Sequence, residues 1–90
     1  MAAYTIRVEL KGDPSFQEYE KLHQLMGGLG FGRTVRGSAG ESQLPHATYY
    51  GYSNSGVEQV RDLVRDSVKS QIQSNILVLV VKTETWALGW

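Results

Sequence analysis

The chain has 90 residues, enough for one domain around one hydrophobic core, and its nine basic and nine acidic residues give a formal net charge of zero. That balance argues against a protein that coats DNA through a basic excess, and equally against an acidic mimic of DNA. The chain has no cysteine, which excludes a disulfide framework, a thiolate zinc site and a cysteine nucleophile.

The N-terminus enters a strand pattern at once and lacks the basic start and long apolar core of a signal peptide. The longest apolar run, 76–81, is too short to span a bilayer. We therefore expect a cytoplasmic protein with no membrane partner.

The first part of the chain predicts a strand followed by a helix. Apolar and polar residues alternate over 4–11, which is typical of a strand with one buried face. Ser15 and Glu18 then form a capping box, and apolar residues at three- and four-residue steps predict an amphipathic helix to about Met26. We expect the glycines at 27 and 28 to end this helix.

The rest of the chain predicts two further strands, a second helix and a last strand. In the third strand Pro45 cannot donate a ladder hydrogen bond, so the strand begins after it or is bulged there. Ser55 and Glu58 form a second capping box. The expected strands are 4–11, 31–36, 44–52 and 76–82, and the expected helices are 15–26 and 55–70.

Two strand–helix–strand units predict an α+β protein with the ferredoxin-like βαββαβ order. In that fold two right-handed crossovers interleave into a four-stranded antiparallel sheet with both helices on one face. A different order of strands in an α+β sheet is the alternative. We expect residues 1–90 to form a single domain, with 83–90 as a C-terminal tail.

The last strand, 76–82, is apolar on both faces, and a strand of that kind needs a cover on each face. The tail, which carries Trp86 and Trp90, is one candidate for this cover. A second copy of the chain is the other, which makes a homodimer a reasonable hypothesis.

Two residues are candidates for catalysis. His23, one step off the apolar stripe of the first helix, can act as a general acid or base because its ordinary pKa lies near neutrality. Glu9, inside the first strand, can hold a divalent metal ion. Simpler alternatives are a partly exposed surface histidine and a carboxylate paired with Arg7 or Lys11. We interpret His46 as a loop histidine without a catalytic role. No metal-ligand cluster has convincing spacing, so we predict no resident metal.

Basic and aromatic residues gather on the predicted strands. The segment G-F-G-R-T-V-R-G at 30–37 is superficially similar to a strand of the RNA-recognition motif, but it lacks the full consensus. Arginines beside tyrosines would supply phosphate contacts and stacking surfaces for single-stranded RNA. Alternatively, the tyrosines are strand formers with half-buried rings, and either Tyr49 or the pair Tyr50 and Tyr52 points outward. The predicted RNA-binding residues are Arg7, Lys11, Arg33, Arg36, Tyr49 and Tyr50.

Four segments carry a resemblance to a known family: Y-T-I-R-V-E-L at 4–10, Y-E-K-L-H-Q-L-M at 19–26, G-F-G-R-T-V at 30–35 and the Leu-Pro pair at 44–45. Over roughly 4–81 the chain resembles the GhoS family, the small endoribonuclease antitoxins of type V toxin–antitoxin systems. The resemblance implies a ferredoxin-like fold, similar to that of the small CRISPR-associated nucleases, and cleavage of the messenger RNA of a membrane toxin. It places Glu9 where the family has an acidic residue, more usually aspartate. His23 falls near the place of a basic residue just before the Leu-Met pair.

We therefore expect an antitoxin-like endoribonuclease that binds and cleaves single-stranded mRNA. Either His23 would assist proton transfer or Glu9 would hold a metal ion. The alternative is a non-enzymatic interaction protein, such as a phage or mobile-element inhibitor of a host defence complex. That protein would bind its partner through Trp86 and Trp90.

Overall fold

The computed structural model describes residues 1–37, 40–85 and 87, so the expectations for Trp86 and Trp90 fall outside the described part of the chain. The protein is α+β. Neither of the two described helices is long and apolar enough to cross a membrane. The elements in chain order are β1 (Ala2–Leu10), α1 (Phe16–Gly28), β2 (Phe31–Gly32), β3 (Thr34–Gly37), β4 (Gly40–Gln43), β5 (Thr48–Ser53), α2 (Val57–Gln71) and β6 (Ile76–Lys82).

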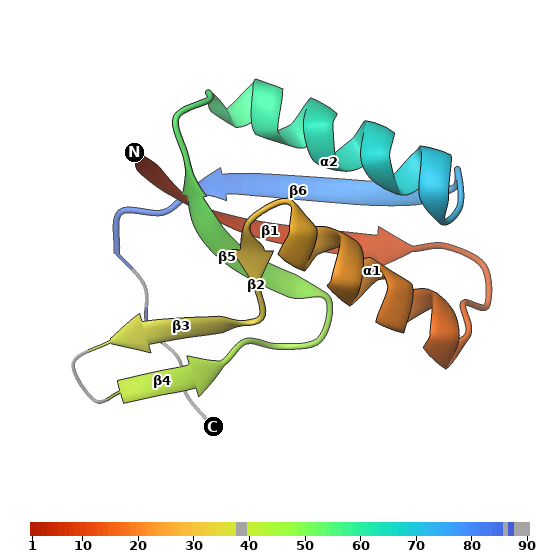
Figure 1. Ribbon diagram of the computed structural model, residues 1–90, viewed down its shortest axis with the longest axis horizontal. Coiled ribbons are helices and arrows are strands. Elements are labelled where there is room, and N and C mark those ends of the chain that lie inside the picture. The colour runs from red at the N-terminus through yellow and green to blue at the C-terminus, as the bar shows by residue number, and fades with distance from the viewer. Residues whose placement is uncertain (38–39, 86, 88–90) are drawn as a thin grey trace.

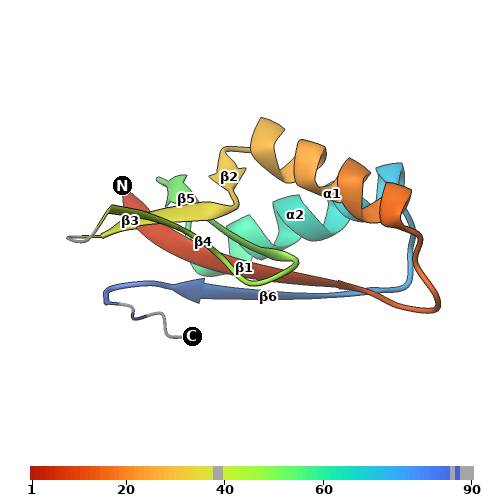
Figure 2. The same ribbon diagram turned by 90° about the horizontal axis from the view of Figure 1, so that it is seen from below.

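Four strands form an antiparallel sheet in the order β2-β5-β1-β6, and β3 and β4 form a separate two-stranded sheet. Figure 1 shows this β3–β4 hairpin projecting to one side of the main sheet. Both helices cover the same face of the main sheet (Figure 2). The arrangement is consistent with the expected ferredoxin-like order but not identical to it, because the hairpin is inserted between β2 and β5.

The capping box of α1 is confirmed. The Glu18 backbone N–H donates to Ser15 Oγ at 3.1 Å, and the Ser15 N–H donates to Glu18 Oε1 at 3.4 Å. The helix ends at Gly28, two residues beyond the expected Met26, and neither Gly27 nor Gly28 has a left-handed backbone. The left-handed backbone falls instead on Gly30, with φ of 95°, where a residue without Cβ adopts that conformation at little cost.

The second capping box lies one residue later than expected. Gly56 is the N-cap of α2, and its backbone N–H donates to Gln59 Oε1 at 2.8 Å. Glycine has no side chain to return a hydrogen bond to the helix, so the pair found in the structure is not the expected pair of Ser55 and Glu58. The apolar stripe of the helix is unaffected by this shift, because Val60, Val64 and Val68 are all buried.

The second expected strand is divided, and the third begins after Pro45, which confirms one of the two expectations for that proline. The segment 31–36 breaks at Arg33, which separates β2 from β3. The segment 44–52 loses its first four residues to a turn that contains Pro45, so β5 begins at Thr48. The Leu44 N–H donates to the Arg33 carbonyl at 2.7 Å, which ties the two breaks together at the base of the hairpin.

One core lies between the helices and the main sheet. Burying each large apolar side chain there contributes about 1.5–3 kcal/mol relative to leaving it in water. The buried residues that form it are Tyr4, Ile6, Val8 and Leu10 of β1, Leu22 and Met26 of α1, Phe31 of β2, Tyr49 of β5, and Val60, Val64 and Val68 of α2.

The opposite face of the main sheet is open. On β6 the side chains of Leu77, Leu79 and Val81 are 55%, 55% and 48% exposed, whereas Ile76, Val78 and Val80 pack against the core. The expectation that β6 is apolar on both sides is therefore confirmed. About half of the surface of its outward side chains remains in contact with water.

Candidate active site

The strongest polar cluster is centred on His23 of α1. Its Nδ1 lies 2.7 Å from the hydroxyl oxygen of Tyr49, whose ring is fully buried at the start of β5. His23 lies at the edge of the buried face of α1, because it is four residues after Tyr19 and three before the buried Met26. A tyrosine hydroxyl both donates and accepts hydrogen bonds, so Tyr49 can hold His23 in either neutral tautomer.

A second histidine faces the same place from the β4–β5 connection. The ring centroid of His46 lies 4.4 Å from that of Tyr19 and 6.0 Å from that of His23. The next residue, Ala47, is buried and has φ of 58°, a left-handed conformation that costs a residue with a side chain about 1–2 kcal/mol. Because the Val8 N–H donates to the Ala47 carbonyl at 3.1 Å, sheet pairing holds this strained turn in place. Strained backbone conformations of this kind are often found at active sites and ligand-binding sites.

Arg33 supplies positive charge to the cluster. It lies at the break between β2 and β3, half-buried, and close enough to His23 and Tyr49 to act on both electrostatically. Burial lowers the pKa of His23 from its ordinary value of 6.5, and the charges of Arg33 and His46 lower it further against an opposing effect of Glu20. Burial also raises the pKa of Tyr49 far above its usual value, so its hydroxyl remains protonated.

Together these residues form what we call the histidine cluster: His23, His46, Arg33, Tyr19 and Tyr49. The centroids of its two imidazoles lie 6.0 Å apart with the rings edge to face. The lowered pKa leaves His23 neutral at neutral pH, which is the form that accepts a proton. The positive guanidinium of Arg33 can stabilise the negative charge that develops on the oxygens of a phosphate during the reaction. The cluster therefore has the parts needed for acid–base chemistry on a phosphodiester.

The structure separates the two predicted catalytic residues. His23 is on the helix-covered side, whereas Glu9 points to the open face of β1, exposed and paired with Lys11 through a 3.0 Å contact between Nζ and Oε1. In residues 1–37, 40–85 and 87 no group of three or more His, Cys, Asp or Glu side chains could hold a metal ion. Within the described part of one chain, Glu9 therefore does not belong to a set of three such ligands.

The predicted RNA-binding residues are also divided between the two faces. Tyr49 is buried, so its ring offers no surface on which a base could stack. Tyr50 and Tyr52 point to the open face with their rings edge to face at a centroid distance of 5.7 Å, which resolves the parity that the sequence left open. Arg7 lies on the same open face, and Arg36 is exposed on β3.

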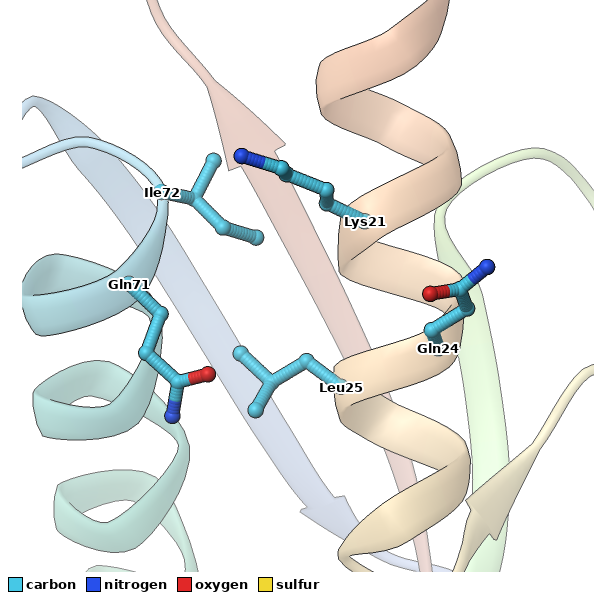
Figure 3. A pocket seen from close by; sticks show the side chains of 5 residues that line it. All are labelled: Lys21, Gln24, Leu25, Gln71 and Ile72. Carbon is cyan, nitrogen blue, oxygen red and sulfur yellow. The ribbon is translucent and has the colours of Figure 1, made fainter.

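A separate hollow of about 480 Å³ lies between the middle of α1 and the C-terminal end of α2. Figure 3 shows Lys21 and Leu25 pointing from α1 toward Gln71 and Ile72 at the end of α2. Lys21 is the one ionisable residue in its lining, so it lacks the paired acid and base that the histidine cluster provides. We therefore place the candidate site at the histidine cluster.

Sequence reasoning assigned no role to His46 or Tyr19. Both lie within the cluster, yet they are 27 positions apart in the chain and come together only when α1 packs across β5. One signal was present in the sequence. A histidine directly after Pro45 sits in a turn, and turns held by a rigid sheet often carry functional side chains.

Comparisons with known proteins do not add a family to this geometry. No protein-family model matches the chain, and no curated protein matches its sequence.

Proposed function

We propose that this protein is a metal-independent endoribonuclease that cleaves single-stranded RNA at the histidine cluster. The observation that carries the proposal is the pair of imidazoles, 6.0 Å apart between ring centroids, with Arg33 beside them. RNA contains its own nucleophile, the 2′-hydroxyl. A protein therefore needs only a base, an acid and a stabiliser of negative charge to cleave it.

In the proposed reaction the neutral His23 accepts the proton of the 2′-hydroxyl. The reaction uses the tautomer in which Nδ1–H donates to the Tyr49 oxygen across the 2.7 Å contact, so that Nε2 is free to act as the base. The 2′-oxygen then forms a bond to the adjacent phosphorus, and the bond from phosphorus to the 5′-oxygen breaks. His46 in its protonated form donates a proton to that leaving oxygen. The products are a 2′,3′-cyclic phosphate and a 5′-hydroxyl.

Arg33 stabilises the extra negative charge that the phosphate oxygens carry during this step. Arg36 lies three residues further along the chain on exposed β3, about 10 Å away at the rise of an extended strand. It would contact the next phosphates of an unpaired strand. This path along the hairpin suits single-stranded RNA, whose backbone is free to follow a basic strip.

The biological setting follows from the resemblance to the GhoS family. We propose that the chain adopts a ferredoxin-like fold enlarged by the β3–β4 hairpin and acts in the cytoplasm as an antitoxin. Its substrate would be the message of a membrane toxin. The order β2-β5-β1-β6, with both helices on one face, supports the fold part of this proposal.

The test is cleavage of an end-labelled single-stranded RNA in the presence of EDTA. We expect products with 2′,3′-cyclic phosphate ends and no cleavage at a nucleotide that carries 2′-deoxyribose. His23→Ala and His46→Ala should each lower the rate by about 100-fold or more, since acid–base groups typically contribute 10²–10⁴-fold. Lys69→Ala, an exposed cation in the last turn of α2, is the matched control and should cleave at the wild-type rate.

Two results would overturn the proposal. One is cleavage that requires a divalent metal ion. The other is equal cleavage by the wild type and the double His23→Ala, His46→Ala variant, which would assign the activity to a contaminant.

A second candidate function is protein binding without catalysis. The half-exposed Leu77, Leu79 and Val81 on the open face favour it, because surface apolar patches often mark interaction sites. Protein binding becomes the favoured function if purified protein cleaves no RNA at any concentration, with or without metal ions.

A further inference from the structure

Strand β6 forms one edge of the main sheet, and half of its backbone groups point away from the sheet. The Lys11 N–H donates to the Asn75 carbonyl and the Thr83 N–H donates to the Ala3 carbonyl, so the odd-numbered residues of β6 bond to β1. The even-numbered residues direct their N–H and C=O groups outward. They are Ile76, Val78, Val80 and Lys82.

The residues of β6 itself, all within the described part of the chain, lack the features that usually protect an exposed strand. Its seven residues, I-L-V-L-V-V-K, contain no proline, and their one charge lies at the last position. Protected edges are typically short, bulged or interrupted by charged side chains. An edge of this length and composition is built to pair with another strand.

The sequence of β6 is complementary to itself around Leu79. An antiparallel pair with a two-fold axis at Leu79 joins Val78 to Val80 of the other copy, and Ile76 to Lys82, so all four outward residues form ladder pairs. Moving the axis to Val78 or Val80 leaves one of the four unpaired. On the open face the same register places Leu79 against its own copy, and Leu77 against Val81.

The neighbouring helix fits the same two-fold arrangement. A groove of about 230 Å³ runs along this edge between Val57, Glu58 and Arg61 of α2 and Val78, Leu79 and Val80 of β6. An axis at Leu79 passes beside this part of α2 and makes the two helices antiparallel. The first turns of the two helices, which carry Glu58 and Arg61, then face each other across the axis, and their opposite charges suit such a pairing. The chain has zero net charge, so two copies do not repel each other.

We propose that β6 binds β6 of a second copy of this chain, in antiparallel register about Leu79, to form a dimer with a continuous eight-stranded sheet. The dimer covers part of the open apolar surface of Leu77, Leu79 and Val81 and satisfies the outward backbone groups of the edge. The proposal does not depend on RNA cleavage.

The sharpest test uses a chain that has no natural cysteine. In the proposed register the two Leu79 positions form a non-hydrogen-bonded pair with Cα atoms about 4.5 Å apart, within the range of a disulfide. Leu79→Cys should therefore form a disulfide-linked dimer under mild oxidation. Leu77→Cys is the matched control, equally exposed, but its two copies would lie about 13 Å apart and should remain unlinked.

Sedimentation of the unmodified chain and two lysine variants gives an independent test. Leu79→Lys places two like charges face to face and should weaken the dimer by about tenfold or more. Tyr52→Lys is 60% exposed on the same open face, two strands from the edge, and should sediment as the wild type does.

Three results would overturn the proposal. The first is a wild-type chain that stays monomeric at about 100 μM. The second is linking of the Leu77→Cys copies at the rate of Leu79→Cys. The third is a dimer that forms only after removal of residues 86–90, which would show that the tail and not a second copy occupies the edge.

Discussion

The hydroxyl of Tyr49 offers a way to separate the folding role of the histidine cluster from its proposed catalytic role. Tyr49→Phe keeps the buried ring and removes one hydrogen bond of 2.7 Å to His23. His23 is only partly buried, so water can replace the lost hydrogen-bond partner, and the imidazole is not left as a buried polar group without a partner. We therefore expect a loss of about 1 kcal/mol in the free energy of unfolding. In a domain of this size that corresponds to a decrease of about 4–8 °C in Tm.

Tyr4→Phe is the matched control. Tyr4 is also buried, 2% exposed, and its hydroxyl donates one hydrogen bond of 2.6 Å, to the carbonyl of the exposed Ser55. The two variants should lose similar stability in thermal unfolding. In RNA cleavage only Tyr49→Phe should lower kcat and change the pH profile, because only it releases the orientation and tautomer of His23.

Equal activity in the two tyrosine variants, together with a large loss in His23→Ala, would refute a positioning role for Tyr49. A Tyr49→Phe variant as stable as the wild type would contradict the magnitude assigned to its hydrogen bond.

Three further predictions concern stability and metal dependence. Gly51→Ala should cost about 3 kcal/mol, because the added Cβ would overlap the Gly30 carbonyl oxygen, whereas Gly32→Ala meets no atom within 4 Å and should change Tm little. The folded protein should lose stability as pH falls below about 6.5. The lowered pKa of His23 means that the unfolded chain binds more protons in that range, and His23→Gln should reduce this slope in thermal unfolding. Glu9→Gln should change the free energy of unfolding by less than about 1 kcal/mol, because the carboxylate is exposed and paired only with Lys11. The variant should also cleave RNA in EDTA at the wild-type rate. A large loss of cleavage would instead indicate that Glu9 binds a metal ion.

The sequence predicted best those segments whose structure follows from a single local pattern of residues. The alternation of apolar and polar residues over 4–11 predicts β1, and the capping box at Ser15 predicts the start of α1. Both signals depend only on residues close together in the sequence. The sequence predictions were wrong where one of several nearby residues had to be chosen for a left-handed backbone or for a helix cap. Gly30, rather than Gly27 or Gly28, takes the left-handed conformation, and Gly56 rather than Ser55 caps α2.

The histidine cluster could be predicted only in part. The near-neutral pKa of a histidine marked His23 as a candidate, but no local pattern pairs it with His46. Their proximity requires α1 to pack on β5 and the left-handed Ala47 to turn the chain between them. Such contacts join residues far apart in sequence, so they depend on the assembled fold.

The amino-acid sequence by itself determined that this is an α+β chain with two amphipathic helices and a last strand that is apolar on both sides. Periodicity, caps and composition act over a few residues and need no knowledge of the fold. Only the tertiary structure decided that β6 lies at the edge of the sheet, that Glu9 and His23 occupy opposite faces, and that two histidines and Arg33 meet. The order of strands assigns each side chain its face and its neighbours, and that order is a property of the whole chain.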